Sequence, residues 1–280
     1  MKKNKQKHTQ SLILILFSIA LSAGFLGLAA GCASTTEQGV VGIDRKQLLI
    51  VPAVQIDQMA QASFTQVKNE AAGKNALDRN PEQVSRVRQI ANRLVPHTQI
   101  FRSDARNWNW EVHVISSDEL NAFCMPGGKI IFYSGIIDKL KLTDPEIAAI
   151  MGHEIAHALR EHSRERASKD MAQNLPLQVL VATGKMDPKY GSLAALGTNL
   201  FLTLPNGREQ ESEADLMGLE LMARAGYNPE EALSLWRKMS SAGGGKPPEF
   251  LSTHPSDDTR ISKITGWLPL VRPLYQKAKR

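Results

Sequence analysis

The sequence predicts an α+β fold that is mainly helical and contains one small antiparallel sheet. Segments with apolar residues at helical spacing outnumber the short stretches that resemble strands. Hydrophobic residues make up 42% of the 280 residues and charged residues 22%, which is typical of a folded globular chain and not of collagen, disordered or polytopic membrane proteins. The length suits one sizeable core. We expect a leader over 1–31, a tether over 32–44, one domain over 45–272 and a tail over 273–280.

Residues 1–31 have the pattern of an export signal. A Lys-rich start precedes an uncharged apolar run, and Leu28-Ala29-Ala30-Gly31-Cys32 resembles a bacterial lipobox. The resemblance implies that Cys32 is lipidated and begins the mature chain, and Ala33 resembles the outer-membrane sorting pattern. We therefore expect a lipid anchor on the periplasmic side of a bacterial membrane, in particular the outer membrane. The alternatives are an uncleaved membrane anchor and plain secretion.

The positive net charge does not indicate a nucleic-acid partner. Four of the 34 Lys and Arg residues lie in the leader, where there is no Asp or Glu, and the other 30 face 28 acidic residues. The net charge thus falls from +6 to +2 without the leader, and we expect no nucleic acid to bind.

The first predicted elements of the domain are a short strand and a helical layer. Residues 46–51 have the composition of a strand. Two segments after it carry apolar residues at helical spacing, 55–72 and 81–95, and Pro81 suits the first turn of the second.

Two further strands are expected in the middle of the chain. Residues 108–115 alternate, and residues 129–134 follow the turn sequence Pro126-Gly127-Gly128. We expect these two strands to pair in the small antiparallel sheet. Cys124 lies in the apolar run 120–125 between them and is interpreted as a buried small hydrophobe.

The second half of the chain is predicted to be helical. Thr143-Asp144-Pro145-Glu146 has the pattern of a capping box, and apolar periodicity continues from it to about residue 169. Three apolar or helical segments follow, at about 190–204, 208–225 and 228–242. Gly243-Gly244-Gly245 then forms a hinge-like break before a loop that contains His254.

His153-Glu154-Ile155-Ala156-His157 lies within the first of these helices. Positions four apart lie one turn above each other on a helix, so the imidazoles of His153 and His157 can bind one metal ion. Zinc is the metal that such a site favours. A catalytic zinc ion takes three protein ligands and keeps a fourth position for water, so a third ligand must come from elsewhere in the chain.

Acidic residues at the start of the helix over 208–225 are the candidates for the third ligand. Two of them, Glu209 and Glu213, share with Glu220 a face that we interpret as solvated. Glu211 instead shares its face with Ala214, Asp215 and Gly218, and the small residues there would allow close packing on the zinc helix. We predict Glu211 as the ligand and Asp215 as the carboxylate that orients a ligand histidine; an ordinary helix-face charge is the alternative for Asp215.

These two motifs together resemble a known family. His153-Glu154-x-x-His157 followed by Glu211-x-x-x-Asp215 is similar to the gluzincins of metallopeptidase family 48, the group of the CAAX prenyl proteases and HtpX. The leader, Leu120-Asn121-Ala122-Phe123 and Pro126-Gly127-Gly128 most resemble the bacterial lipoprotein members of the LoiP and BepA type. The resemblance covers roughly residues 45–265. No tetratricopeptide-like tail follows, which favours the LoiP-like branch.

The resemblance implies a zincin-like domain, one Zn²⁺ per chain and peptide hydrolysis. Glu154 is then the general base that accepts the proton of the metal-bound water. A substrate would lie extended along the strand over 129–134 and add a strand to the sheet, which favours unfolded chains. The substrate-binding residues expected on this basis are Asn121, Gly128, Ile130 and Phe132.

The role of His254 stays open between three alternatives. In the lipoprotein members a His-Pro loop at this position lies over the zinc ion and can occupy its open site, which would make the enzyme latent. His254 could instead stabilise the oxyanion, with Arg260 as a weaker candidate for that role, or simply pack under Pro255. The other histidines singled out are interpreted as structural or solvent-facing: His97, His113 and His162.

Two functions of different classes fit these observations. The first is a membrane-anchored zinc metalloendopeptidase that cleaves misfolded or misassembled envelope proteins. The second is an outer-membrane assembly factor or chaperone-like binding module whose proteolysis is incidental. A structural zinc site normally has four protein ligands and no open position. This motif instead keeps a glutamate at the position of the general base, so the sequence favours the peptidase.

Overall fold

The computed structural model describes residues 32–174, 199–242, 248–254 and 259–279, so the predicted leader over 1–31 lies outside the described residues. The N-terminal half contains the following elements: β1 (Cys32–Ala33), β2 (Gln47–Leu48), α2 (Ala53–Gly73), α3 (Pro81–Leu94), the 3-10 helices η1 (Val95–Ile100) and η2 (Ser103–Asn107), β3 (Glu111–Ile115), β4 (Ala122–Met125), β5 (Lys129–Tyr133) and α4 (Ser134–Lys139).

The C-terminal half is helical wherever it forms regular structure in the described ranges. Its elements are α5 (Asp144–Leu159), α6 (His162–Gln173), α8 (Asn199–Leu202), α9 (Arg208–Arg224), α10 (Glu231–Ser241), α11 (Glu249–Thr253) and α12 (Arg260–Ala278). The mainly helical α+β fold is confirmed. The Leu- and Ala-rich stretch around 190–204 is described only from residue 199 onward, where it forms α8.

A three-stranded mixed sheet replaces the antiparallel sheet that the sequence predicts. The strand order is β3-β5-β4, with β5 in the centre. β5 is antiparallel to β4 but parallel to β3, in a register that pairs Glu111 with Lys129. The two strands expected over 108–115 and 129–134 do pair, but in parallel and not antiparallel as predicted, because β4 lies between them in the sequence and is the hairpin partner of β5.

The sequence did not predict β4 because its four residues are all buried and give no alternation. The turn at Pro126-Gly127-Gly128 joins β4 to β5, and both glycines have a positive φ, of 77° and 78°. Cys124 lies in β4 and is buried, as expected; burial raises the pKa of its thiol well above the usual range.

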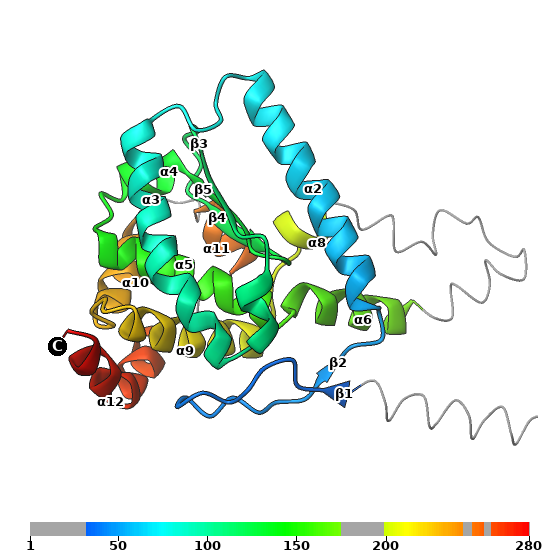
Figure 1. Cartoon of the computed structure of the whole chain (residues 1–280), viewed down its shortest axis with the longest axis vertical. Helices are drawn as coiled ribbons and strands as arrows, with labels where there is room; N and C mark the ends of the chain where they lie inside the picture. Colours follow the sequence, from blue (N-terminus) through cyan, green and yellow to red (C-terminus); the bar gives the residue numbers. More distant parts are fainter. Residues whose placement is uncertain (1–31, 175–198, 243–247, 255–258, 280) are drawn as a thin grey trace, which may run out of the picture.

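Helices are stacked beneath the sheet in successive layers (Figure 1). α5 packs against β4 on one side and against α9 on the other, and α9 in turn packs on α12. α5 is buried along almost its whole length, because its composition is apolar on every face apart from the HEIAH motif. Its start has the predicted capping box, in which the side chain of Glu146 accepts the backbone N–H of Thr143 at 2.8 Å.

α5 and α9 cross at two glycines. A Cβ atom added to Gly218 would lie 2.8 Å from the backbone nitrogen of His153, and one added to Gly152 would lie 3.0 Å from the carbonyl oxygen of Gly218. No side chain separates the two backbones at this point, so the residues that α9 presents one and two turns before Gly218 reach the motif on α5.

Residues 33–48, which we call the N-terminal segment, pack against the domain. The sequence predicts a flexible tether over 32–44, yet Val41 and Ile43 belong to the buried core. The carboxylate of Glu220 accepts the backbone N–H groups of Val40 and Val41 at 3.0 and 3.3 Å. Glu220 is fully buried by this contact, which overturns its interpretation as a solvated residue.

Two helices differ from the predicted boundaries. The helix expected from residue 143 to 169 breaks at Glu161, whose φ of 49° is left-handed, and continues as α6. α12 runs across the boundary expected between 272 and 273. Pro269 and Pro273 inside it obscure the helical pattern in the sequence, since each removes a backbone hydrogen bond.

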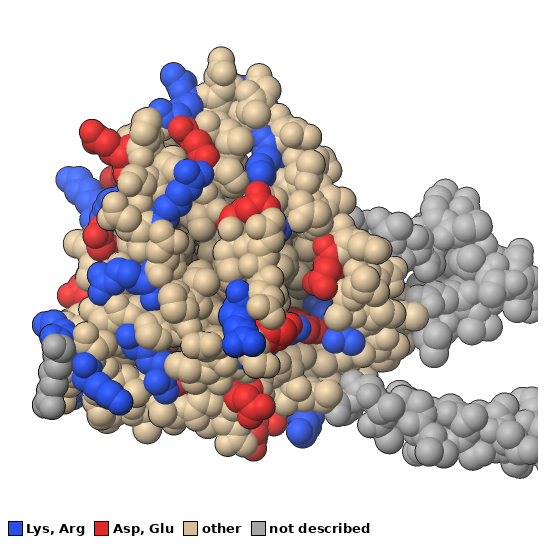
Figure 2. Space-filling view, in the orientation of Figure 1, with Lys and Arg blue, Asp and Glu red and all other residues tan. Residues whose placement is uncertain are grey.

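The surface of the described part carries both signs of charge. Basic and acidic side chains are interspersed over the face seen in Figure 2. Within residues 32–174, 199–242, 248–254 and 259–279, the helices all fall short of the length or apolar character that crossing a bilayer requires.

The glycine crossing makes a prediction about stability. Gly218→Ala would force α9 away from α5, because the new methyl group meets backbone atoms, and should cost about 1–3 kcal/mol. Gly266→Ala is the matched control, since Gly266 lies in α12 with open space at its Cβ, and it should leave stability unchanged or raise it by up to about 1 kcal/mol. Thermal unfolding of both variants measures the difference, and equal melting temperatures would contradict the tight crossing.

Candidate metal centre

α5 places the three motif side chains in the interior of the domain. His153 and Glu154 are 3% exposed and His157 is 7% exposed. The two rings lie at 74° to each other, with their centroids 4.6 Å apart, and their Nε2 atoms are separated by 3.0 Å. The predicted convergence of the two imidazoles is present.

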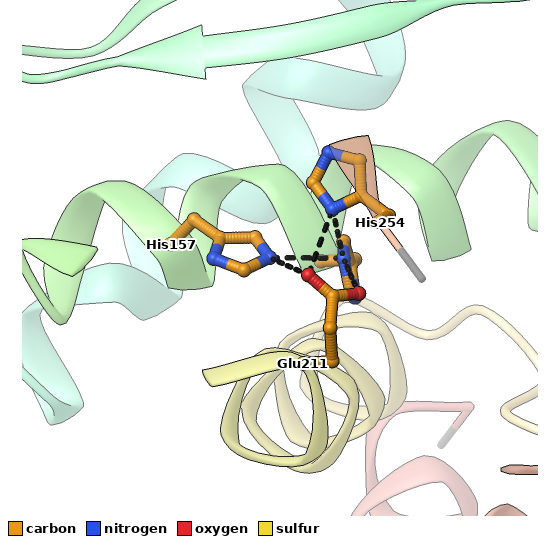
Figure 3. Close-up of side chains that lie close together, drawn as sticks. His157, Glu211 and His254 are labelled. Carbon is orange, nitrogen blue, oxygen red and sulfur yellow. Dashed lines mark hydrogen bonds and ion pairs between the residues drawn. The ribbon is translucent and has the colours of Figure 1, made fainter. Parts of the chain in front are cut away.

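Glu211 reaches the same point from α9. Its Oε2 lies 3.4 Å from Nε2 of His153, and its Oε1 lies 3.3 Å from Nε2 of His157. Figure 3 shows the carboxylate of Glu211 pointing from α9 toward the rings. The structure therefore brings together the three residues that the sequence predicts as ligands.

The three residues fit a zinc ion. Zinc ligands lie about 2.0–2.1 Å from the metal, so two ligand atoms of a tetrahedral site are separated by about 3.3 Å. The separations found here, between 3.0 and 3.4 Å, match that value. Oε2 of Glu211 is also buried without a hydrogen bond from any described residue; Nη1 of Arg260 forms an ion pair with it at 3.2 Å, and a metal ion would give it a ligand bond.

His254 is a fourth member of the cluster. Its Nδ1 lies 3.1 Å from Nε2 of His153 and 3.0 Å from Oε1 of Glu211, and all four ligand atoms lie within 4.8 Å of one another. The ring stacks on Phe250 of α11, at 18° and 4.4 Å between centroids, which fixes its direction. The glycines proposed as its hinge (243–245) and Pro255 lie outside the described residues.

Glu154 lies beside this cluster. Its Oε1 is buried without a hydrogen bond among the described residues and is 3.3 Å from Nε2 of His254. Burial raises the pKa of Glu154 above its usual range, which is the direction that suits a general base.

The charges of the cluster favour a cation. Although burial opposes ionisation, the neighbouring His254 and His153 hold the pKa of Glu211 well below its usual range, so this ligand is an anion. Burial also opposes the charged form of His153, but the carboxylates of Glu211 and Asp215 outweigh it and raise its pKa to about 9. The site thus attracts positive charge, whether a proton or a metal ion.

Asp215 binds the outer nitrogen of His153, as predicted. Its Oδ1 lies 3.0 Å from Nδ1 of His153. Arg260, a weaker candidate for the oxyanion, instead donates to both oxygens of Asp215 at 2.6 and 2.7 Å and lies 3.2 Å from Glu211. The guanidinium is also 3.3 Å from the centroid of Trp236. Arg260 therefore holds the acidic residues in place and neutralises them.

The sequence missed two residues on the other side of the site. Nδ1 of His162 lies 2.7 Å from Nδ1 of His157, and Nε2 of His162 lies 3.0 Å from Oε2 of Glu213. Both residues are buried, so the interpretation of Glu213 as solvated is wrong. On an unbroken helix, a residue five positions after His157 would point about 140° away from it. The break at Glu161 turns His162 back, and no Gly or Pro in the sequence marks that break.

The predicted substrate strand is also corrected. β5 is paired on both edges, and Ile130 and Phe132 are fully buried, so a peptide cannot add to this strand. Gly128 lies under Trp110, where an added Cβ would be 2.6 Å from the indole ring. Asn121 does line the pocket that contains Glu154, together with residues of β4.

Comparison with known proteins identifies the family. The sequence pattern of Peptidase family M48 matches residues 81–268. The chain belongs to this family. M48 peptidases are zinc-dependent, and the buried His/Glu cluster is suited to hold one such ion. The family that the two motifs resemble is thereby confirmed.

Relatives within the M48 family come from both mitochondria and bacteria. The mitochondrial metalloendopeptidase OMA1 of Schizosaccharomyces pombe is 36% identical over 214 residues, which are 76% of this chain and 60% of the relative. OMA1 of Saccharomyces cerevisiae is 34% identical over 60% of this chain and 50% of its own length. The beta-barrel assembly-enhancing protease of Escherichia coli K12 is 26% identical over 72% of this chain and 42% of its own length. The chain thus spans about half the length of these relatives.

Proposed function

We propose that the chain is a zinc-dependent metalloendopeptidase with His153, His157 and Glu211 as metal ligands and Glu154 as the general base. The observation that carries this proposal is the buried Oε1 of Glu154, which points at the ligand cluster without a hydrogen bond. A bound zinc ion would polarise the scissile carbonyl and acidify a water molecule. Glu154 would accept the proton from that water and pass it to the leaving amine.

The edge of β4 is the surface that would hold the substrate. β4 is an edge strand of the described sheet, and its residues line a pocket with Glu154, His157 and His254. A peptide that pairs with this edge must be extended, because only main-chain hydrogen bonds along the strand position it beside Glu154. Unfolded or misfolded chains meet this requirement and folded ones do not.

The proposed substrates are misfolded or misassembled envelope proteins at a bacterial membrane. The leader pattern and the lipobox-like sequence before Cys32 support a lipid anchor on the periplasmic side, in particular of the outer membrane. More than one acyl chain would make that anchor stable. The name of the Escherichia coli relative, a protease that enhances β-barrel assembly, is consistent with this setting.

His254 supports a latent state of the enzyme. Its Nδ1 lies 3.1 Å from Nε2 of His153 and 3.0 Å from Oε1 of Glu211, so His254 would take the fourth position of a bound zinc ion, which a catalytic water needs. Activation would require His254 to move away from Glu211 before Glu154 can act on water.

The same arrangement supports a second candidate function. Four closed ligands are typical of a structural zinc site, and His254 completes such a set in this structure. The chain would then be an assembly factor or chaperone-like binding module, and its proteolysis would be incidental. The two functions differ in whether Glu154 is required.

Three glutamate variants of the full-length chain separate the base from the ligand. Glu154→Gln should abolish casein cleavage while one zinc ion per chain is retained, because the ligands are intact. Glu211→Gln should lose both zinc and cleavage, since it removes the anionic ligand. Glu209→Gln is the control, an exposed residue on the same turn of α9, and should keep both. Cleavage by Glu154→Gln at the rate of the unsubstituted chain would contradict the assignment of the base.

Removal of the fourth side chain tests latency. His254→Ala should raise the turnover of casein, because it opens the fourth position while His153, His157 and Glu211 still bind zinc. Ser252→Ala, an exposed position on α11, is the control and should not change the rate. A fall in turnover with unchanged zinc content would show that His254 assists the reaction instead.

Lipid attachment is tested in a bacterial host that processes lipoproteins. Cys32→Ser should abolish incorporation of a labelled fatty acid and release the chain from the membrane fraction. Cys124→Ser should be labelled normally, since that thiol is buried. Equal labelling of the two variants would rule out Cys32 as the attachment site.

A further inference from the structure

A continuous series of contacts leads from His157 to the N-terminal segment. Nδ1 of His157 lies 2.7 Å from Nδ1 of His162, whose Nε2 lies 3.0 Å from Oε2 of Glu213. Nε of Arg45 then donates to Oε1 of Glu213 at 2.8 Å. His162 is fully buried, and Glu213 is 8% exposed. We call His162, Glu213 and Arg45 the relay.

With a metal ion bound to Nε2 of His157, the contacts allow only one arrangement of protons along the relay. Because His157 presents Nε2 to Glu211, at 3.3 Å, metal binding uses the lone pair of Nε2 and the ring proton lies on Nδ1. That N–H donates to Nδ1 of His162, which must be unprotonated. The proton of His162 is then on Nε2, where it is donated to Glu213. Each ring is thereby fixed in one tautomer and one orientation.

Arg45 is the point at which the N-terminal segment joins this relay. Its guanidinium binds two buried carboxylates: Nη1 donates to Glu165 at 2.7 Å, and Nε and Nη2 donate to Glu213 at 2.8 and 3.0 Å. Arg160 fixes the segment further, since it donates to the backbone carbonyl of Arg45 and to the hydroxyl of Ser34. Arg160 also donates to Glu213, at 3.1 Å, and Lys169 pairs with Glu165 at 2.8 Å. Of the described residues, however, Arg45 alone contacts both carboxylates, so removal of the segment would break the bridge between them.

We propose that His162 and Glu213 are positioning residues for the metal ligand His157, and that Arg45 makes the N-terminal segment part of the support of the metal centre. This inference rests on the metal site of the proposed function. His153 has the equivalent support from Asp215 and Arg260. The imidazole of His153 is thus supported by Asp215 of α9 and Arg260 of α12, whereas that of His157 is supported by the relay, in which only Arg45 belongs to the N-terminal segment.

Two substitutions of His162 distinguish a role in positioning His157 from a role in packing alone. The oxygen of His162→Asn can take the place of Nδ1 and accept from His157, but it cannot reach Glu213. His162→Gln has the reverse property, because its amide extends to the place of Nε2. Zinc affinity of the full-length chain is measured by competition with a chromophoric chelator, without substrate. His162→Gln should lose about 10–100-fold in affinity, and His162→Asn should keep most of it.

A matched pair of arginines tests the N-terminal segment. Arg45→Met removes the cation that bridges Glu213 and Glu165 and should weaken zinc binding by about 10-fold. Arg164→Met is the control, because Arg164 also ties α6 to the chain that follows the segment, through the carbonyl of Val51, but does not contact the relay. It should leave zinc affinity unchanged even if the melting temperature falls.

A failure of this inference can be told apart from a failure of the proposed peptidase function, because the affinity for zinc is measured without any cleavage of substrate. Equal affinities of His162→Asn and His162→Gln would overturn the positioning role, whatever their stability. Equal affinities of Arg45→Met and Arg164→Met would overturn the role of the N-terminal segment. If Arg45→Met fails to fold, Arg45→Lys decides: an ammonium has three donors and cannot replace the four hydrogen bonds of the guanidinium, so affinity should still fall, and an unchanged value overturns the proposal.

Discussion

The close crossing of α5 and α9 at Gly152 and Gly218 is the constraint on which the metal centre depends. The two backbones are in contact there, so side chains one and two turns along α9 reach across to α5. Three acidic residues of α9 depend on this proximity. Glu211 lies beside the Nε2 atoms of His153 and His157, Asp215 contacts Nδ1 of His153, and Glu213 contacts His162. A wider crossing would leave all three carboxylates short of their partners.

The sequence predicted the parts of the site that depend on local geometry. The spacing of His153 and His157 is sufficient to bring two imidazoles together on any helix, and small residues beside Glu211 indicated which face of α9 packs inward. The sequence did not predict features that depend on distant segments. Glu220 is buried because the N-terminal segment covers it, and His162 faces His157 only because the helix breaks at Glu161.

The strand order of the sheet is another feature that the sequence did not predict. Alternation of apolar and polar residues indicates a strand with one exposed face. All four residues of β4 are buried, so the sequence pattern did not reveal the strand that lines the pocket of Glu154. Without β4, the order β3-β5-β4 and the parallel pairing of β3 with β5 could not be deduced. The turn at Gly127 and Gly128 was recognised, but its partner strands were not. The predicted substrate strand was wrong for this reason.

The length of chain between Arg45 and Glu213 has a consequence for the order of folding. These residues are separated by 168 positions, and the contact between them closes most of the domain into one loop. Loop closure of this size is late and entropically costly, so it follows the local folding of the helices. Because synthesis starts at the N-terminus, the surroundings of His157 are complete only after the chain has been made beyond residue 213.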